Sequence, residues 1–236
     1  MIRKIFFCLV FISAFGRFQS NAQGIDPGDV GKIRAEFRLC IGGGFETHPI
    51  FETTDGTTIN ISAGGGLGAG VNIGYRLFDA VELSSEFLYQ MSVLDQPVSN
   101  ATTTFRRFVI TPTAKYLFFL KKDKSRLSIN AGGGWGIYPS AKLDIDASNL
   151  PNGSHDIYEY NNGSGPHGCI EFEFCTRKKI SFLGGIKFYH VTYKLESIKS
   201  DGITYPLNYI PQVILKEYGK IDGSGLDLYA GISFLF

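Results

Sequence analysis

Apolar and polar residues alternate along much of the chain, most clearly in its last stretch. From Leu226 to Phe236 the even positions are apolar, whereas the odd positions carry Asp227, Tyr229, Gly231 and Ser233. A period of two places successive side chains on opposite faces of a β-strand. The stretch is long enough to cross a bilayer when tilted, and it stops on an aromatic residue. This pattern predicts a strand with one apolar and one polar face.

The same alternation recurs in seven earlier segments. We therefore expect eight amphipathic strands, at residues 33–44, 60–76, 81–93, 108–118, 127–137, 170–174, 180–188 and 226–236. The connections after the second, fourth and sixth segments are short. The other connections are long and cover residues 45–59, 94–104, 138–166 and 192–222. Short turns at one end and long loops at the other are typical of transmembrane barrels.

The first 22 residues have the character of a secretory signal peptide. Arg3 and Lys4 precede an apolar run, and small residues up to Ala22 occupy the positions that a signal peptidase reads. We expect residues 1–22 to be a signal peptide, 23–32 a periplasmic leader and 33–236 an outer-membrane barrel. Cleavage after Ala22 leaves 20 basic against 22 acidic residues. This balance gives no reason to expect nucleic-acid binding.

Periodicity alone fits two kinds of barrel. In a membrane barrel the apolar face points to lipid, whereas in a soluble, lipocalin-like carrier the same face lines the interior. The signal peptide, the terminal Phe236 and the alternating loop lengths favour the membrane. We therefore expect an all-β, eight-stranded, antiparallel up-and-down transmembrane β-barrel, with the lipocalin-like carrier as the alternative.

Together these features resemble the small eight-stranded outer-membrane barrels of the OmpA/OmpX type and the "outer membrane protein beta-barrel domain" family. The likeness rests on the signal peptide, the eight alternating segments and the aromatic Phe236. It implies a location in the cell outer membrane, in contact with lipid and lipopolysaccharide. It also implies recognition of the C-terminal strand by the barrel-assembly machinery, with Phe236 as the assembly signal.

The polar face of the segments carries six basic and six acidic residues. An interior as narrow as that of an eight-stranded barrel is filled by side chains, and a buried charge needs a partner. We expect a salt-bridge network in the lumen, with a proton or solute path as the alternative. Its members are Arg34, Glu36, Arg38, Arg76, Glu82, Glu86, Arg107, Lys115, Glu171, Glu173, Lys187 and Asp227.

Three glycine triplets, at 42–44, 64–66 and 132–134, look at first like phosphate-binding loops. A dinucleotide fingerprint needs a strand before it and a helix after it, and here the alternation is expected to continue through the glycines. Glycine at inward positions instead leaves room for long charged side chains. No ligand spacing suggests a metal site. We therefore expect no cofactor and no metal.

One short pattern suggests an enzyme. His190 and Thr192, with Glu196 downstream, faintly resemble the His-x-Ser arrangement of the lipid A 3-O-deacylases. That resemblance implies His190 as base, the Thr192 hydroxyl as nucleophile and Glu196 as the group that orients the imidazole. The alternative interpretation places His190 in an aromatic girdle at the membrane interface.

The two longest loops are rich in tyrosine, which suits either a contact surface or a loop that lies on lipid headgroups. The tyrosines are Tyr138, Tyr158, Tyr160, Tyr193, Tyr205, Tyr209 and Tyr218. We expect a structural or surface-interaction role through long extracellular loops, toward an unknown surface ligand. The alternatives are a lipid A-modifying enzyme and a small-solute pore.

Overall fold

The structure is a computed structural model that describes residues 32–52, 56–78, 80–95, 98, 100–119, 126–150, 153–161, 163–177 and 180–236. The expected signal peptide and almost all of the expected leader lie outside these residues. The described chain is almost entirely β, with one short 3₁₀ helix, η2 (Leu207–Tyr209), and one α-helix, α2 (Gln212–Tyr218). None of the helices in these ranges has the length and apolarity needed to cross a membrane.

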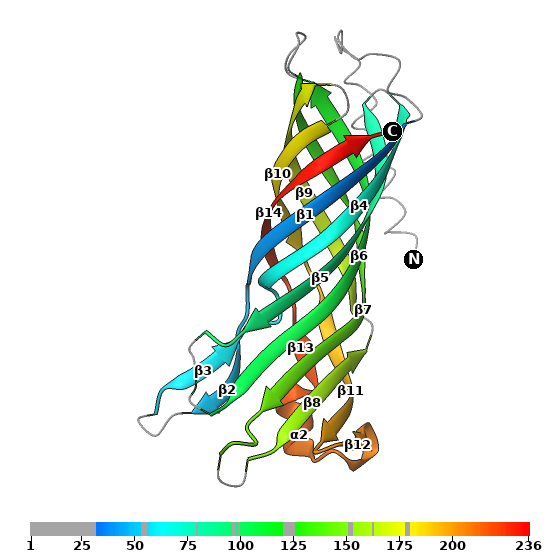
Figure 1. Cartoon of the computed structure of the whole chain (residues 1–236). Coiled ribbons are helices and arrows are strands. Elements are labelled where there is room, and N and C mark those ends of the chain that lie inside the picture. The colour runs from blue at the N-terminus through cyan, green and yellow to red at the C-terminus, as the bar shows by residue number, and fades with distance from the viewer. Residues whose placement is uncertain are drawn as a thin grey trace.

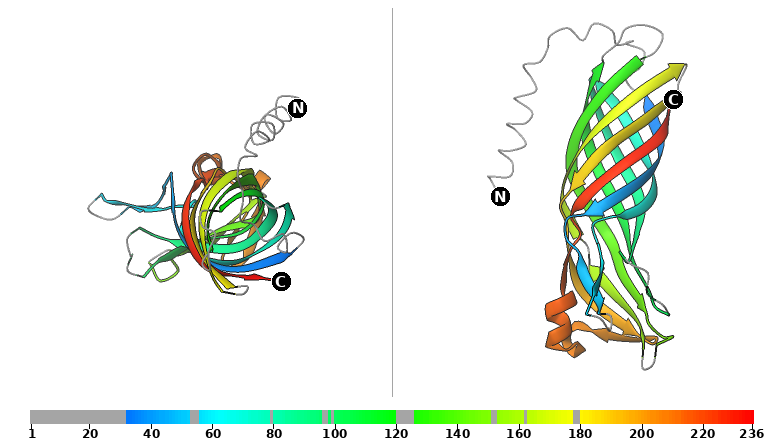
Figure 2. Two further views of the ribbon diagram at one scale, coloured as in Figure 1. Left: turned by 90° about the horizontal axis from the view of Figure 1, so that it is seen from above. Right: turned by 90° about the vertical axis from the view of Figure 1, so that its left-hand side faces the viewer.

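Eight antiparallel strands form a closed barrel (Figures 1 and 2). Each strand pairs with the next around the wall, and β14 pairs with both β10 and β1, which closes the sheet. The strands are β1 (Ile33–Gly44), β4 (Gly66–Phe78), β5 (Val81–Val93), β6 (Thr102–Phe119), β7 (Arg126–Asp146), β9 (Gly163–Arg177), β10 (Ile180–Tyr189) and β14 (Gly225–Leu235). The expected fold class is therefore confirmed.

The last strand closes the cylinder against the first. Phe37 of β1 faces Ile232 of β14, and the pairing extends over the length of both strands. The backbone N–H of Phe236 donates to the Ile33 carbonyl at 2.9 Å. As expected from the sequence, β14 closes the wall. Its pairing with β1 leaves no unpaired backbone edge exposed to lipid, and the alternation directs its apolar side chains outward.

The two faces of the wall differ sharply in chemistry. Outward residues such as Phe37 and Phe172 are 51% and 54% exposed, whereas their inward neighbours Arg38 and Glu171 are buried. A soluble carrier would show the opposite arrangement, so the lipocalin-like alternative is wrong. An apolar surface that surrounds the whole cylinder needs a lipid environment.

The connections of the barrel are short at one end and long at the other. The hairpins β4–β5, β6–β7 and β9–β10 turn at the same end at which β1 begins and β14 ends (Figure 1). This is the alternation of connection lengths expected from the sequence.

The long connections are not irregular loops, which corrects the sequence analysis. They contain β2 (His48–Glu52), β3 (Thr58–Ile61), β8 (His155–Asn161), β11 (Thr192–Ser200), β12 (Ile203–Pro206) and β13 (Lys220–Asp222). Strands β6 and β7 run beyond the barrel and continue the sheet into β8 and β11. We call β8, β11, β12, β13, η2, α2 and the outer parts of β6 and β7 the extension. In Figure 1 it projects from the barrel at the long-loop end.

The expected continuous strand over 60–76 is also wrong. β3 ends at Ile61 and pairs with β2 in a separate hairpin, and β4 begins only at Gly66. Gly66 has a φ of +108°, and a side chain there would collide with the Met91 carbonyl. Glycine at this position therefore allows a turn rather than an uninterrupted strand.

Candidate functional site

The inner face of the barrel carries a connected network of charges, with Arg34 at the short-turn end. The Arg34 guanidinium donates from Nη1 to Glu173 Oε2 at 2.6 Å and from Nη2 to Glu82 Oε1 at 2.7 Å. Nη2 also lies 2.7 Å from Glu36 Oε1. The Arg34 side chain is only 2% exposed. These carboxylates therefore take the place of water around a buried cation.

Arg38 and Lys115 extend the network along the bore. Arg38 donates from Nε to Glu36 and from Nη2 to Glu171, both at 2.6 Å. Lys115 Nζ lies 3.5 Å from Glu171 and 3.8 Å from Glu36. Arg38 and Glu36 both belong to β1, but β1, β6 and β9 are not neighbours in the wall. The pairs Arg38–Glu171, Lys115–Glu171 and Lys115–Glu36 therefore span the lumen.

Lys187 extends the same network to β5, β10 and β14, because its partner Glu86 also lies 3.5 Å from Arg38. Lys187 of β10 contacts Glu86 of β5 and lies 3.9 Å from Asp227 of β14. The Thr111 hydroxyl donates to Glu86 at 3.1 Å. Each carboxylate in the lumen thus has at least one cation or hydroxyl close to it, as a low-dielectric interior requires.

The structure places all twelve charged residues named in the sequence analysis at buried positions. Ten of them take part in ion pairs with one another; Arg76 is buried near the short-turn end, and Arg107 lies apart, toward the long-loop end. Glycines provide the space: a side chain on Gly74 would come within 2.7 Å of the Glu82 carboxylate.

Arg107 organises the long-loop end of the lumen. Its guanidinium donates to Gln90 Oε1 at 2.5 Å and to the Tyr189 hydroxyl at 2.6 Å. Nη1 also donates to the carbonyls of Ala63 and Gly223, at 3.1 and 3.0 Å. Ala63 lies between β3 and β4, and Gly223 between β13 and β14. One side chain therefore ties two connections to the barrel wall.

Sequence reasoning missed most of these partners of Arg107. Gln90 lies on the polar face of its strand, so its inward position could be expected from the alternation. Tyr189 lies two residues after Lys187 and therefore on the same inward face of β10, so its position also followed from the alternation. The remaining partners are backbone carbonyls, which no pattern of residue types reveals.

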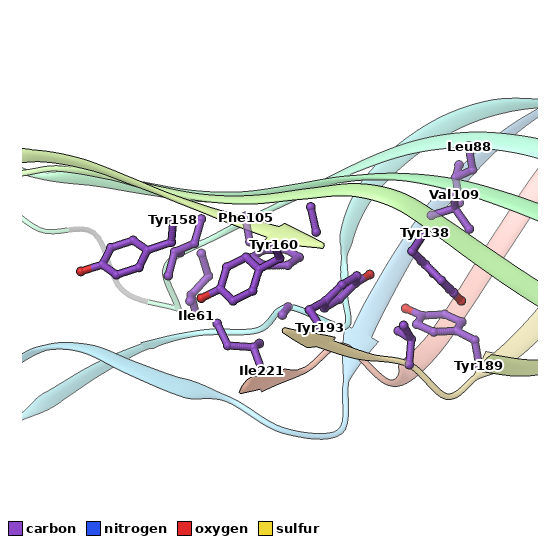
Figure 3. Close-up of a cluster of buried hydrophobic side chains, with 14 of the residues drawn as sticks. Ile61, Leu88, Phe105, Val109, Tyr138, Tyr158, Tyr160, Tyr189, Tyr193 and Ile221 are labelled. Carbon is purple, nitrogen blue, oxygen red and sulfur yellow. The ribbon is translucent and has the colours of Figure 1, made fainter. Parts of the chain in front are cut away.

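The extension has an aromatic core that includes Phe105, Tyr158, Tyr160 and Tyr193 and continues into the buried residues of the barrel (Figure 3). The ring of Tyr193 lies 5.6 Å from that of Phe105 and 5.9 Å from that of Tyr138. Burial raises the pKa of the Tyr160 and Tyr193 hydroxyls above the ordinary value. These phenols therefore stay neutral at a pH at which an exposed tyrosine begins to ionise.

For four of the seven loop tyrosines, this core corrects the expectation that they form a contact surface or lie on lipid headgroups. Tyr138, Tyr158, Tyr160 and Tyr193 are all buried. The physical reason is the alternation within the extension strands: Tyr158 and Tyr160 of β8, and Tyr193 of β11, fall on the face that packs inward. Period-two patterning was present in these segments, but the segments were interpreted as loops.

No family model and no curated protein matches this sequence. Among solved structures, the outer membrane protein OprG from Pseudomonas aeruginosa superposes with a TM-score of 0.61 at 12% sequence identity. The match covers 92% of this chain and 99% of that one. The chain has the fold of the small outer-membrane β-barrels.

Two further outer-membrane structures align over most of their length with this outer-membrane barrel. Neisserial surface protein A matches with a TM-score of 0.44 at 12% identity, and covers 87% of this chain and 96% of its own. The outer membrane protein AlkL, determined in lipid bilayers, matches with a TM-score of 0.44 at 10% identity, and covers 93% and 95%. Likeness at such low identity concerns the fold.

The far end of the extension exposes apolar side chains. Tyr209 of η2 and Val213 of α2 are 72% and 75% exposed, and Ile203 at the start of β12 is also exposed. In contrast, Ile210 is buried in the extension core. We call Ile203, Tyr205, Leu207, Tyr209 and Val213 the tip.

The enzyme-like residues of the outer-membrane barrel are not brought into a catalytic arrangement with one another. His190 Nδ1 lies 2.7 Å from the hydroxyl of Ser224, and Glu196 is exposed on β11. The Ser224 hydroxyl accepts the Val191 backbone N–H at 3.1 Å and is buried. Ser224 therefore stabilises the connection between β10 and β11. Within the described ranges, no three His, Cys, Asp or Glu side chains are placed to hold a metal.

Proposed function

We propose that this outer-membrane barrel is a non-enzymatic surface-interaction protein, in which a closed barrel anchors a folded extension outside the cell. The long connections face the exterior and the short turns face the periplasm, as the lengths of the connections favour. The observation that carries the proposal is the extension itself, because its buried aromatic core holds an exposed apolar tip in a fixed place.

The lumen supports an anchor rather than a pore. Ion pairs from Arg34 and Lys115 connect strands on opposite sides of the bore. A solute would have to separate these pairs, and removing one partner from a buried pair costs about 3–5 kcal/mol. Arg107 and its partners add a second layer of hydrogen bonds at the long-loop end.

The tip supports a role in protein contact. Tyrosine is among the residues that contribute most to binding at protein interfaces. Soluble surfaces rarely carry clusters of exposed apolar residues, and such clusters mark interaction sites. Tyr209 and Val213 are well exposed although Ile210, between them, anchors the segment in the core. A partner protein can therefore bury the tip without first ordering it, which lowers the entropic cost of association.

We further infer that the terminal strand carries the recognition element for the barrel-assembly machinery. Support for this comes from the position of β14 at the seam and from the exposed Phe236 side chain. The deacylase-like alternative has no comparable support, because Thr192 and Glu196 make no contact that would complete a triad with His190. Lipid A acyl chains, measured by mass spectrometry, should be the same with His190→Ala.

The function can be tested by placing a photoreactive amino acid at Tyr209 and irradiating intact cells. Protein adducts should form at Tyr209 and not at Lys142, an exposed control position on the same extension. Purified wild-type protein should suppress the adducts, whereas the Tyr209→Ser/Val213→Ser variant should not. Equal adducts at both positions, or equal suppression by both proteins, would contradict a tip-specific contact.

A further inference from the structure

Two lysines face each other on the outer surface of the extension. Lys194 of β11 and Lys220 of β13 are direct partners across the antiparallel pair, and both are exposed. Side chains in such positions have their Cβ atoms about 5 Å apart, and like charges directly opposite each other are destabilising. In the described part of the chain, neither ammonium group has a carboxylate within ion-pair distance. The pair therefore lacks a counterion of its own.

Two other cations of the same sheet have a carboxylate partner. Lys142 Nζ lies 2.6 Å from Glu159 Oε1, its cross-strand partner. Arg106 Nη2 lies 3.0 Å from Asp144 Oδ2. Lys194 and Lys220 differ from them in that two lysines without a carboxylate partner face each other across a strand pair.

The pair also lies at a defined height above the apolar surface of the barrel. Phe188 and Leu226 are partners near the long-loop end of the wall, and Phe188 is half exposed to the lipid side. Lys194 follows Phe188 by six residues, and Lys220 precedes Leu226 by six. By strand rise this is at most about 20 Å, and the strand tilt shortens the height above the apolar surface. Both lysines therefore lie above the apolar surface, on the side of the polar layer of the membrane.

We propose that Lys194 and Lys220 together bind a phosphate group of lipopolysaccharide in the outer leaflet. A phosphate offers several charged acceptors, so that both ammonium groups can donate to it and their mutual repulsion is offset. The bound lipid would hold the extension against the membrane surface. The choice of the outer leaflet rests on the proposed function, which places the long connections outside the cell.

The test uses the full-length protein refolded in a neutral detergent, with diphosphoryl lipid A as the probe. Wild-type protein binds the probe, and Lys194→Gln/Lys220→Gln binds it about tenfold or more weakly, because two charge-assisted contacts are lost. The control Lys199→Gln/Lys216→Gln removes two other exposed lysines and keeps the wild-type affinity. The difference in gel migration between unheated and boiled samples shows that each variant is folded.

Two results would overturn the assignment. One is equal affinity of Lys194→Gln/Lys220→Gln and wild type for lipid A. The other is equal binding of dephosphorylated lipid A, or full competition by inorganic phosphate or by phosphatidylglycerol, since the site would then not select a phosphate of lipopolysaccharide. The binding test in detergent does not depend on the orientation of the protein in the membrane. Surface labelling of whole cells tests that orientation separately.

Discussion

Arg34 of β1 and Glu173 of β9 are joined across the lumen at 2.6 Å, although β14 and β10 lie between their strands in the wall. The same guanidinium reaches Glu82 of β5 at 2.7 Å. One side chain therefore links three parts of the cylinder. Such ion pairs across the lumen hold the wall of the barrel at a fixed width. They also explain why charged side chains lie at the centre of a protein whose outer surface faces lipid.

Arg34→Met should lower the free energy of unfolding by about 3–5 kcal/mol, because it leaves buried carboxylates without their cation. Urea unfolding in lipid vesicles measures this. The control Arg106→Met breaks an exposed pair with Asp144 and should cost about 1 kcal/mol or less. Equal effects of the two variants would show that the lumen network adds no more than a surface pair.

The intact barrel should show no stepwise conductance in planar bilayers, because cross-lumen ion pairs fill the bore. Arg107→Ala should remain closed, since the network around Arg34 and Arg38 stays in place beneath it. Discrete current steps from wild-type protein, at a frequency proportional to the amount added, would show that the charges line a path.

Tyr193→Ala should destabilise the extension by about 3–5 kcal/mol through the cavity left among aromatic rings. The barrel should keep its heat-modifiable migration. Limited proteolysis of membrane vesicles should then cut within β8 and β11, which the wild type resists. Tyr209→Ala, at the exposed tip, should change stability by no more than about 0.5 kcal/mol and serves as the control. Loss of the folded barrel in Tyr193→Ala would contradict this prediction, because it would show that the barrel depends on the extension for its stability.

The contact between β7 and β8 should weaken in acid. A hydrogen bond from Lys142 lowers the pKa of Glu159 below its ordinary value. The stabilisation it gives is present above the unfolded-state pKa of about 4.3 and is lost as the pH falls through the folded-state value. Hydrogen-exchange protection of β8, corrected for intrinsic rates, should fall over that range in wild type and not in Lys142→Met. Because both groups are partly exposed, the effect should be small.

The barrel itself could be derived from the sequence because its signal is periodic. Alternation gave the eight strands, the inward side of Arg34 or Lys187 and the closing role of β14. Two features could not be derived. The first is that the long connections contain strands, whereas the sequence analysis interpreted them as loops. Tyr158, Tyr160 and Tyr193 alternate with polar residues as strand residues do. A strand outside the bilayer has no apolar outer face, so this alternation was not recognised as that of a strand.

The partners of Arg107 lay beyond sequence reasoning for another reason. Two are the carbonyls of Ala63 and Gly223, and any residue has a carbonyl. Their position depends on the turn at Gly66 and on the path of the chain between β13 and β14. Such contacts follow from the three-dimensional arrangement, whereas charge pairing in the lumen follows from residue type and face.

The central claim is that a closed barrel presents the extension outside the cell, and cysteine accessibility on intact cells tests it most directly. A membrane-impermeant maleimide should label Tyr209→Cys at once. It should label Ala80→Cys, in the β4–β5 turn, only after the outer membrane is permeabilised. Unsubstituted protein gives the background from the native cysteines. Immediate labelling of Ala80→Cys with protection of Tyr209→Cys would place the extension in the periplasm and contradict the proposed function.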